Sequence, residues 1–426
     1  MSTKTKAIRG MRDVLPDETP IWQWLENKLR RLTFRYGYNE MRLPLLEPVS
    51  LFERSIGEAT DIIAKEMYNF TDKSGEHVTL RPEGTSGCMR AVLENNLCYN
   101  KTQRIWYQGP MFRYERPQKG RLRQFTQFGV EAFAMKGPDI DAELIFMVRD
   151  LFQELGLTQY VRLELNSLGT LEERQQHREQ LLLWFEAHRD ILDEESIKRL
   201  ETNPLRILDS KNPAMQSMLE QAPKLLDYLN EESRNHFNTV CQIIDCAGIP
   251  YTINPRLVRG LDYYTRTVFE WITDELGAQG TVCGGGRYDG LAELFNPKAL
   301  PACGFAIGIE RLLLLIQTLQ QNDNPLWHFS ANVVITNEMN DDGLYAQTIA
   351  EKIRSNINAL SVVVDCSGSK LKRQHHTARQ NQCQIIVTIN KDHTLRMWDL
   401  SGAQQLTIGE KELINWLQKY YQKFLG

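Results

Sequence analysis

The sequence predicts a mixed α/β (α+β) protein, with a large first part built on an antiparallel sheet and a compact α/β domain with a mixed sheet at the end. Segments 104–112 and 125–133 are rich in aromatic and β-branched residues and flank a polar loop, which predicts a long-looped antiparallel hairpin. Residues 170–250 are charged and leucine-containing with a helical period, which predicts a helical insertion. Beyond residue 326, strand-like and helix-like segments alternate, which predicts the mixed sheet.

Length and charge set the first limits on function. A chain of 426 residues has room for two or three domains. We expect one domain over residues 1–325, a linker rich in glutamine and asparagine at Gln317–Leu326, and a last domain over residues 326–426. The chain carries 50 basic and 54 acidic residues, so contact with nucleic acid would have to come from local basic patches.

Targeting segments and metal motifs give no positive signal. No apolar run has the length of a signal peptide or a membrane helix, which predicts a cytoplasmic protein with no membrane contact. The eight cysteines are scattered, without a Cys-x-x-Cys pair or a histidine at zinc spacing. We therefore expect reduced thiols and no metal held by protein ligands.

The first hundred residues carry three local predictions. A helix over Ile21–Tyr36 leads into a short strand over Glu40–Pro44 that the proline closes. This pair suits a subunit interface, although a core helix with an edge strand is the simpler interpretation of the segment alone. Residues Met67–Pro82 predict a hairpin that turns at Ser74-Gly75.

Glu83 and Thr85 follow that hairpin, just before a helix expected over Met89–Leu97. Thr85 offers a hydroxyl to a ligand, or it is no more than a helix cap. Glu83 stands ahead of the helix on a turn that contains glycine, and it is the stronger candidate for a carboxylate that binds a ligand.

The loop of the long hairpin is unusually basic for an acidic chain, which suggests a polyanion nearby. Strand alternation places Arg113 and Glu115 on one face of the first strand, and Gly129 is expected to leave an open space on the second. These polar groups indicate either a ligand site or a solvated sheet face with a charged turn. The residues concerned are Arg116, Lys119, Arg121 and Arg123 in the loop, and Phe125, Gln127, Gly129, Glu131 and Phe133 on one face of the return strand.

Three later segments combine glycine with charge. Strand character is expected over Leu257–Tyr264 and again over Thr267–Trp271. The glycine cluster Gly284–Asp289 lets backbone approach a ligand closely, but it lacks the order of a dinucleotide or Walker motif. In Gly304–Arg311, small residues lead into a helix whose early arginine opposes the helix dipole unless an anion is present, which favours a phosphate or a base as the ligand.

Taken together, these segments resemble the class II aminoacyl-tRNA synthetases, and within them the histidyl-tRNA synthetases, over essentially the whole chain. The helix with Pro44 resembles the first class II motif, Phe112–Glu115 with its loop the second, and Gly304–Arg311 the third. Arg259–Tyr264 and Gly285–Asp289 resemble the narrower signatures of the histidine-specific branch. The departures are Ala306, where glycine is frequent, and Leu122, where an aromatic residue is sometimes found.

The resemblance implies a class II synthetase-type antiparallel-sheet catalytic domain with a helical insertion, and a C-terminal domain that reads the anticodon of tRNA(His). It implies a homodimer that joins L-histidine to ATP, with Mg²⁺ accompanying the phosphates, and then charges the tRNA. Arg113 and Arg259 would be catalytic. The other roles implied are ATP binding by Arg113, Glu115, Phe125 and Arg311; histidine binding by Glu83, Thr85, Gln127, Glu131, Arg259, Tyr264 and Tyr288; and contact with the tRNA acceptor end by Arg116, Gln118, Lys119, Arg121 and Arg123.

Two expectations from the sequence conflict with simple geometry or charge. Arg259 and Tyr264 have opposite parity, so a strand that carries both into one site must bend, with Gly260 the expected position. The C-terminal domain shows no concentrated basic face in its sequence, so its role as an anticodon reader is implied by the resemblance alone.

Two other functions are compatible with parts of this sequence. A regulatory relative that binds histidine and modulates a biosynthetic enzyme, or a sensor of uncharged tRNA, typically loses the arginines of the ATP site or the anticodon domain. Here Arg113, Arg259, Arg311 and the final domain are present. A class II enzyme for threonine, proline or glycine is disfavoured by the two histidine-specific signatures.

Overall fold

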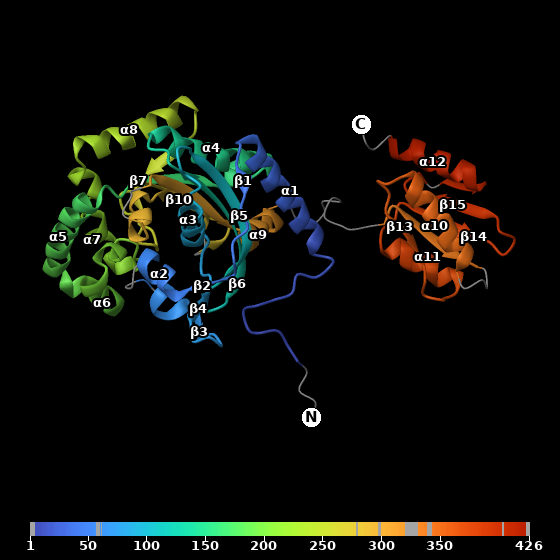
Figure 1. The fold of residues 1–426 in the computed structure, drawn as a ribbon, viewed down its shortest axis with the longest axis horizontal. Helices are drawn as coiled ribbons and strands as arrows, with labels where there is room; N and C mark the ends of the chain where they lie inside the picture. Colours follow the sequence, from blue (N-terminus) through green and yellow to red (C-terminus); the bar gives the residue numbers. More distant parts are fainter. Residues whose placement is uncertain are drawn as a thin grey trace. The chain divides into compact units, whose positions relative to one another are not determined.

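The computed structural model describes residues 5–56, 60, 62–277, 280–296, 300–319, 331–338, 343–402 and 404–422. The chain divides into two compact units, Met1–Asn324 and Pro325–Gly426 (Figure 1). The linker expected at Gln317–Leu326 falls largely outside the described residues, and its first three residues belong to a helix that ends at Leu319.

The first unit is built on an eight-stranded sheet, in which the hairpin expected from the sequence forms the second and third strands. All pairs are antiparallel except the two outermost, β1 with β5 and β7 with β8. In spatial order the strands are β1 (Asn39–Glu40), β5 (Gln103–Phe112), β6 (Gln124–Phe133), β11 (Ala302–Gly308), β10 (Thr281–Arg287), β9 (Thr265–Ile272), β7 (Arg162–Ser167) and β8 (Tyr251–Ile253).

Helices cover this sheet and a small second sheet adjoins it. The amphipathic helix expected near the amino terminus is α1 (Thr19–Arg35), which packs on α4 (Pro138–Glu154), and α4 in turn packs on β10 and β11. The remaining elements are α2 (Val49–Ile56), α3 (Thr85–Glu94), α9 (Ile309–Leu319) and a three-stranded sheet of β2 (Leu46–Pro48), β4 (His77–Leu80) and β3 (Tyr68–Thr71), in which β3 and β4 form the expected hairpin.

The expected helical insertion connects β7 to β8, two strands that pair with each other. It contains α5 (Leu171–Ala187), α6 (Glu194–Thr202), α7 (Gln216–Glu220) and α8 (Glu231–Cys246). Thr170 and Glu173 form a capping box that starts α5. Helices α5 to α7 bury their own apolar cluster, whereas α8 packs back on α4. The insertion thus has an apolar cluster of its own, and its last helix packs on α4.

Two strands expected from the sequence differ in the structure. Of the strand expected over Glu40–Pro44, only Glu40 lies in a strand, β1. The Met41 amide donates to the Trp106 carbonyl at 2.8 Å, and residues 41–44 then leave the sheet. Residues 254–264 form a loop rather than a strand. Arg259 and Tyr264 can therefore both face the site without a bulge at Gly260, since successive side chains of a loop need not point to opposite faces.

The second unit is a mixed five-stranded sheet with helices, as expected. In the order β13 (Val362–Val364), β12 (Val333–Asn337), β14 (Ile385–Ile389), β15 (Leu395–Asp399) and β16 (Gln404–Ile408), the first three strands are parallel and the last three antiparallel. Its helices are α10 (Leu344–Asn356), α11 (Leu371–Gln380) and α12 (Glu410–Gln422). Within the described parts of both units, no helix is long and apolar enough to cross a membrane.

Candidate functional site

A single cavity of about 280 Å³ gathers most of the residues singled out in the sequence. Its walls come from the long hairpin, the start of α3, the loop before β9, strands β10 and β11, and the first turn of α9. The candidate residues that line it are Glu83, Thr85, Arg113, Glu115, Arg121, Phe125, Gln127, Arg259, Tyr264 and Arg311. A guanidinium-rich hollow of this kind is suited to an anionic ligand.

Glu83 caps α3, a role that the sequence suggested for Thr85. Its two carboxylate oxygens accept hydrogen bonds from the backbone amides of Thr85 at 2.7 Å and Ser86 at 2.8 Å. Thr85 is the first residue of the helix, and its hydroxyl donates to Glu131 Oε1 at 2.8 Å. The buried Glu83 carboxylate is therefore held rigidly at a helix amino terminus on the cavity wall.

The hairpin supplies an amide, a guanidinium and an aromatic ring from neighbouring positions. Gln127 accepts a hydrogen bond from the Gly84 amide through Oε1 at 3.0 Å, so its amide nitrogen is the atom that would donate to a ligand. Arg113 donates through Nε to the Pro82 carbonyl at 2.9 Å, and its guanidinium lies 5.3 Å from the centre of the Phe125 ring. These contacts fix the direction of the Arg113 charge toward the cavity.

Glu131 and Tyr288 do not line the cavity, and they form a buried cluster behind its wall. Glu131 accepts hydrogen bonds from Thr85, from the Tyr107 hydroxyl at 3.0 Å and from the Tyr288 hydroxyl. Burial raises the pKa of Glu131 to about 8 against the opposing effect of these donors. Burial, followed by the neighbouring Glu131 charge, raises the pKa of Tyr288. The fold therefore holds a carboxyl group whose charge changes near neutral pH.

The space expected beside Gly129 is filled by Tyr107. Tyr107 pairs with Gly129 across the hairpin, and a Cβ atom at Gly129 would lie 2.2 Å from the Tyr107 ring. Gly84 makes room for the same ring, since a Cβ there would lie 2.1 Å from it. The two glycines thus leave room for the Tyr107 ring, whose hydroxyl donates to Glu131. The prediction that Gly129 leaves an open space for a ligand is wrong.

Arg259 reaches the cavity from the loop before β9 and is held by a partner that sequence reasoning missed. It pairs with Glu270 on β9, which also accepts a hydrogen bond from the Thr281 hydroxyl at 2.9 Å. Gly284 pairs with Glu270 across the strands, and a Cβ at Gly284 would lie 2.4 Å from the Arg259 guanidinium. Burial opposes the charge of Arg259, but Glu270 outweighs it and raises the pKa.

The first turn of α9 brings Arg311 and Glu310 to the cavity. Arg311 donates to the Thr281 carbonyl at 2.6 Å, while Glu310 accepts the Thr126 amide with both oxygens at 2.8 and 2.9 Å. Burial, followed by the positive charge of Arg121, lowers the pKa of Arg311. A bound anion would offset both the charge of Arg121 and the helix dipole, which the sequence suggests is unfavourable for an arginine here.

The basic loop divides into an exposed rim and a packed base. Arg116, Gln118, Lys119 and Arg121 are exposed, and Arg121 pairs with Glu115 at 2.6 Å. Arg123 is only partly exposed. Its guanidinium lies 3.7 Å from the centre of the Tyr114 ring, and its Nε donates to the Glu115 carbonyl at 3.1 Å. Arg123 therefore supports the loop more than it presents charge.

The second unit carries exposed basic side chains on and beside α11, although its sequence indicates no concentrated basic face. Residues 366–391 contain neither aspartate nor glutamate. The exposed basic side chains on and beside α11 are Lys370, Lys372, Arg373 and Arg379. Arg379 also lies 5.1 Å from the centre of the Trp398 ring on β15. A helix and a neighbouring strand thus combine cations with an aromatic ring, which suits a nucleic acid.

The residues missed in the sequence share a cause. Tyr107, Glu270, Tyr263 and Glu310 lie in segments that read only as strand, loop or helix start. Tyr263 lines the cavity, and its ring lies 5.5 Å from that of Tyr288. The one available signal was register, because Tyr107 faces Gly129 and Glu270 faces Gly284, and a large side chain opposite a glycine can fill its space.

Comparison with known proteins places this arrangement in a family. The family model described as histidyl-tRNA synthetase matches residues 10–312. The crystal structure of apo S. aureus histidyl-tRNA synthetase is 33% identical, covers 97% of this chain and 99% of its own, and superposes with a TM-score of 0.79. The fold class expected from the resemblance is confirmed by this match.

Two further structures are more distant and support the fold alone. A histidyl-tRNA synthetase from Nostoc sp. PCC 7120 is 18% identical, with 98% and 99% of the two chains covered and a TM-score of 0.69. A protein from Bacillus halodurans C, described as an ATP phosphoribosyltransferase regulatory subunit/histidyl-tRNA synthetase, is 21% identical, with 88% and 97% covered and a TM-score of 0.62.

Proposed function

This chain belongs to the histidyl-tRNA synthetase family of class II aminoacyl-tRNA synthetases, and we propose that it is an active histidine–tRNA ligase. In the first step a carboxylate oxygen of L-histidine attacks the α-phosphorus of ATP, the bond to the β-phosphate oxygen breaks, and pyrophosphate leaves. In the second, a ribose hydroxyl of the 3′-terminal adenosine of tRNA(His) attacks the histidyl carbonyl carbon, and AMP leaves. The product serves protein synthesis.

The observation that carries this proposal is the convergence of Arg113, Arg259 and Arg311 on one cavity. Attack on the α-phosphate brings together two anions and needs no protein nucleophile, so fixed positive charge and alignment supply most of the catalysis. Arg113 would hold the α-phosphate and Arg259 the carboxylate and phosphate. Phe125 and Arg311 would enclose the adenine, with Arg311 also reaching the terminal phosphates.

The ammonium and carboxylate of histidine would lie against Glu83, Thr85 and Gln127, where a rigid carboxylate and an amide nitrogen face the cavity. The imidazole would extend toward Glu131, beside Tyr264 and Tyr288. A buried carboxyl group with a pKa near 8 is suited to a ring that itself titrates near neutrality. A side chain without ring nitrogens could not exchange hydrogen bonds with these groups and would bind more weakly.

Mg²⁺ would accompany the phosphates of ATP. Although the sequence predicts no metal held by protein ligands, the carboxylates of Glu115 and Glu310 line the cavity with the arginines, and Mg²⁺ takes one or two carboxylates together with phosphate oxygens. When bound, it would neutralise charge on the pyrophosphate that leaves.

The tRNA would contact both units of the chain. The exposed residues of the hairpin loop would meet the acceptor end, with Gln118 able to read a base edge. The α11 face would contact the anticodon arm, which gives the second unit its role as an anticodon-binding domain. We propose a cytoplasmic homodimer on the basis of the family.

A regulatory relative is the main alternative, because one of the structures of similar fold carries a regulatory description. Such a protein needs a histidine site but no phosphate site. The cavity instead combines both kinds of group, and its carboxylates and arginines are held by separate partners, Glu83 by the α3 amides and Arg259 by Glu270. This favours the ligase.

Charging of tRNA tests the proposal. The purified protein would be incubated with ATP, Mg²⁺, radiolabelled histidine and total tRNA, and the acid-precipitable label measured, with Arg113→Ala as the inactive control. We expect charging by the wild type alone. Histidine binding without charging of any tRNA would overturn the ligase in favour of the regulatory alternative.

A further inference from the structure

Arg287 is a buried charged residue next to Tyr288. Its side chain is fully buried, and each of its five N–H donors has an acceptor. The acceptors are Asp141 Oδ2 at 3.2 Å and Oδ1 at 2.5 Å, the carbonyls of Met135 at 3.0 Å and Gly137 at 2.9 Å, and Asp289 Oδ1 at 3.0 Å. A guanidinium bound in this way has a single orientation.

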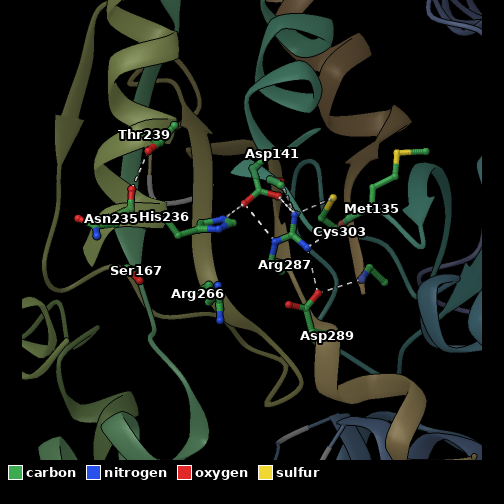
Figure 2. Close-up of polar contacts among 12 residues, drawn as sticks. Met135, Asp141, Ser167, Asn235, His236, Thr239, Arg266, Arg287, Asp289 and Cys303 are labelled. Atoms are coloured by element: carbon green, nitrogen blue, oxygen red, sulfur yellow. Dashed lines mark hydrogen bonds and ion pairs between the residues drawn. The ribbon is translucent and has the colours of Figure 1, made fainter. Parts of the chain in front are cut away.

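Asp141 joins Arg287 to the helical insertion. It lies in the first turns of α4, and its Oδ2 atom also bonds to His236 Nε2 on α8 at 2.8 Å. Figure 2 shows the Asp141 carboxylate between the imidazole of His236 and the guanidinium of Arg287. Burial opposes ionisation of Asp141, but Arg287 and His236 outweigh it and lower the pKa. Asp141 therefore stays ionised at neutral pH.

The same contacts clamp Tyr288 from both sides. Arg287 precedes it and Asp289 follows it, and Asp289 Oδ1 accepts hydrogen bonds from both Arg287 and the Ala302 amide at 3.0 Å. The Tyr288 amide donates to the Ala302 carbonyl at 2.8 Å. Held by its own amide and by the side chains of both its neighbours, Tyr288 directs its hydroxyl to Glu131. A change in the position of Arg287 would therefore shift Tyr288 and, through the Tyr288 hydroxyl, the Glu131 cluster.

We propose that His236 is a positioning residue for the histidine subsite: through Asp141 and Arg287, the last helix of the insertion sets Tyr288 against Glu131. The inference rests on the proposed function, which places the imidazole beside Tyr288. Removal of His236 takes the shorter, 2.8 Å hydrogen bond from Asp141 Oδ2 and leaves it the 3.2 Å bond from Arg287 Nε, so the carboxylate can rotate and Arg287 loses its unique geometry. The reacting groups are untouched, and histidine recognition alone weakens.

Two substitutions at His236 and one control on the same helix test this. His236→Leu removes the donor, His236→Gln keeps an N–H at similar reach, and Thr239→Ala removes a hydroxyl that bonds only within α8, to the Asn235 carbonyl at 2.8 Å. The measurements are KM for histidine and for ATP in pyrophosphate exchange, the histidine Kd by calorimetry without ATP, and the thermal midpoint.

We expect His236→Leu to raise histidine KM and Kd by roughly 10- to 100-fold, because a misplacement of about 1 Å costs that much. ATP KM should stay within about twofold, His236→Gln should recover most of the loss, and Thr239→Ala should match the wild type. Unchanged histidine affinity in a folded His236→Leu protein would overturn the proposal. So would a loss shared equally by histidine and ATP.

If His236→Leu fails to fold, Asp141→Asn supplies the same comparison, since it removes the charge that orients Arg287 while keeping the shape of the side chain. The calorimetric Kd needs no catalysis. A wild type that binds histidine but shows no pyrophosphate exchange would therefore contradict the proposed ligase activity. The positioning role of His236 would still be tested by the histidine Kd of the variants.

Discussion

Gly304→Ala would place a methyl group where the structure has no room for one, in the wall between the cavity and Glu131. Gly304 pairs with Glu131 across β11 and β6, and a Cβ atom there would lie 1.8 Å from Glu131 Oε2 and 2.4 Å from the Val130 carbonyl. Side-chain carbons do not approach other heavy atoms closer than 3.0 Å. The Glu131 carboxylate must therefore shift by more than about 1 Å, a displacement that typically costs about 100-fold in rate.

The assay is pyrophosphate exchange with histidine and ATP varied separately. We expect kcat/KM for histidine to fall about 100-fold while ATP KM changes by less than about threefold, with a stability cost of about 1–3 kcal/mol from overpacking. Gly290→Ala is the matched control, because a Cβ there meets nothing within 4 Å. Normal histidine kinetics in Gly304→Ala would refute the placement of Glu131 in the histidine subsite.

The remaining predictions concern other parts of the site. Arg259→His should slow adenylate formation by roughly 100-fold or more in single-turnover kinetics, and Glu270→Gln should slow it by about 10-fold or more with the fold intact; wild-type rates would remove the pair from the mechanism. Because burial raises the pKa of Glu131 to about 8, its contribution to stability is complete at low pH and is lost as pH rises through 8. The thermal midpoint of the wild type should therefore fall from about pH 5 to 8.5 relative to Glu131→Gln, and parallel profiles would contradict the shift. Reversing two charges on α11 with Lys372→Glu and Arg373→Glu should raise tRNA KM and flatten its salt dependence, with histidine-dependent exchange unchanged; unaltered tRNA kinetics would exclude this face.

The elements that local pattern specifies were predictable from the sequence. The aromatic and β-branched alternation of β5 and β6 predicted the hairpin, and the apolar period of α1 predicted its helix. Leu257–Tyr264 has the composition of a strand and is predicted as one, but it forms the loop before β9. Its composition does not show that it pairs with no neighbouring strand. Strand composition describes burial as much as pairing.

The inner layer of the site depends on contacts between distant segments, and the sequence did not reveal it. Glu131 was expected to face the ligand directly, yet Thr85 and Gly304 stand in the cavity wall in front of it. The sequence does not reveal Glu270, because its contact with Arg259 depends on Gly284 on the next strand. Gly284 leaves the space that the Arg259 guanidinium occupies. Both cases depend on register between strands, which composition does not specify.

Amino-acid-dependent exchange of pyrophosphate into ATP, with Mg²⁺, without tRNA, and with each common amino acid in turn, tests the central claim most directly. Convergence of Arg113, Arg259 and Arg311 with the Glu131 cluster predicts exchange with histidine and with no other amino acid. No exchange from a folded protein that binds histidine would contradict the account, and exchange with a different amino acid would contradict the assignment of the subsite.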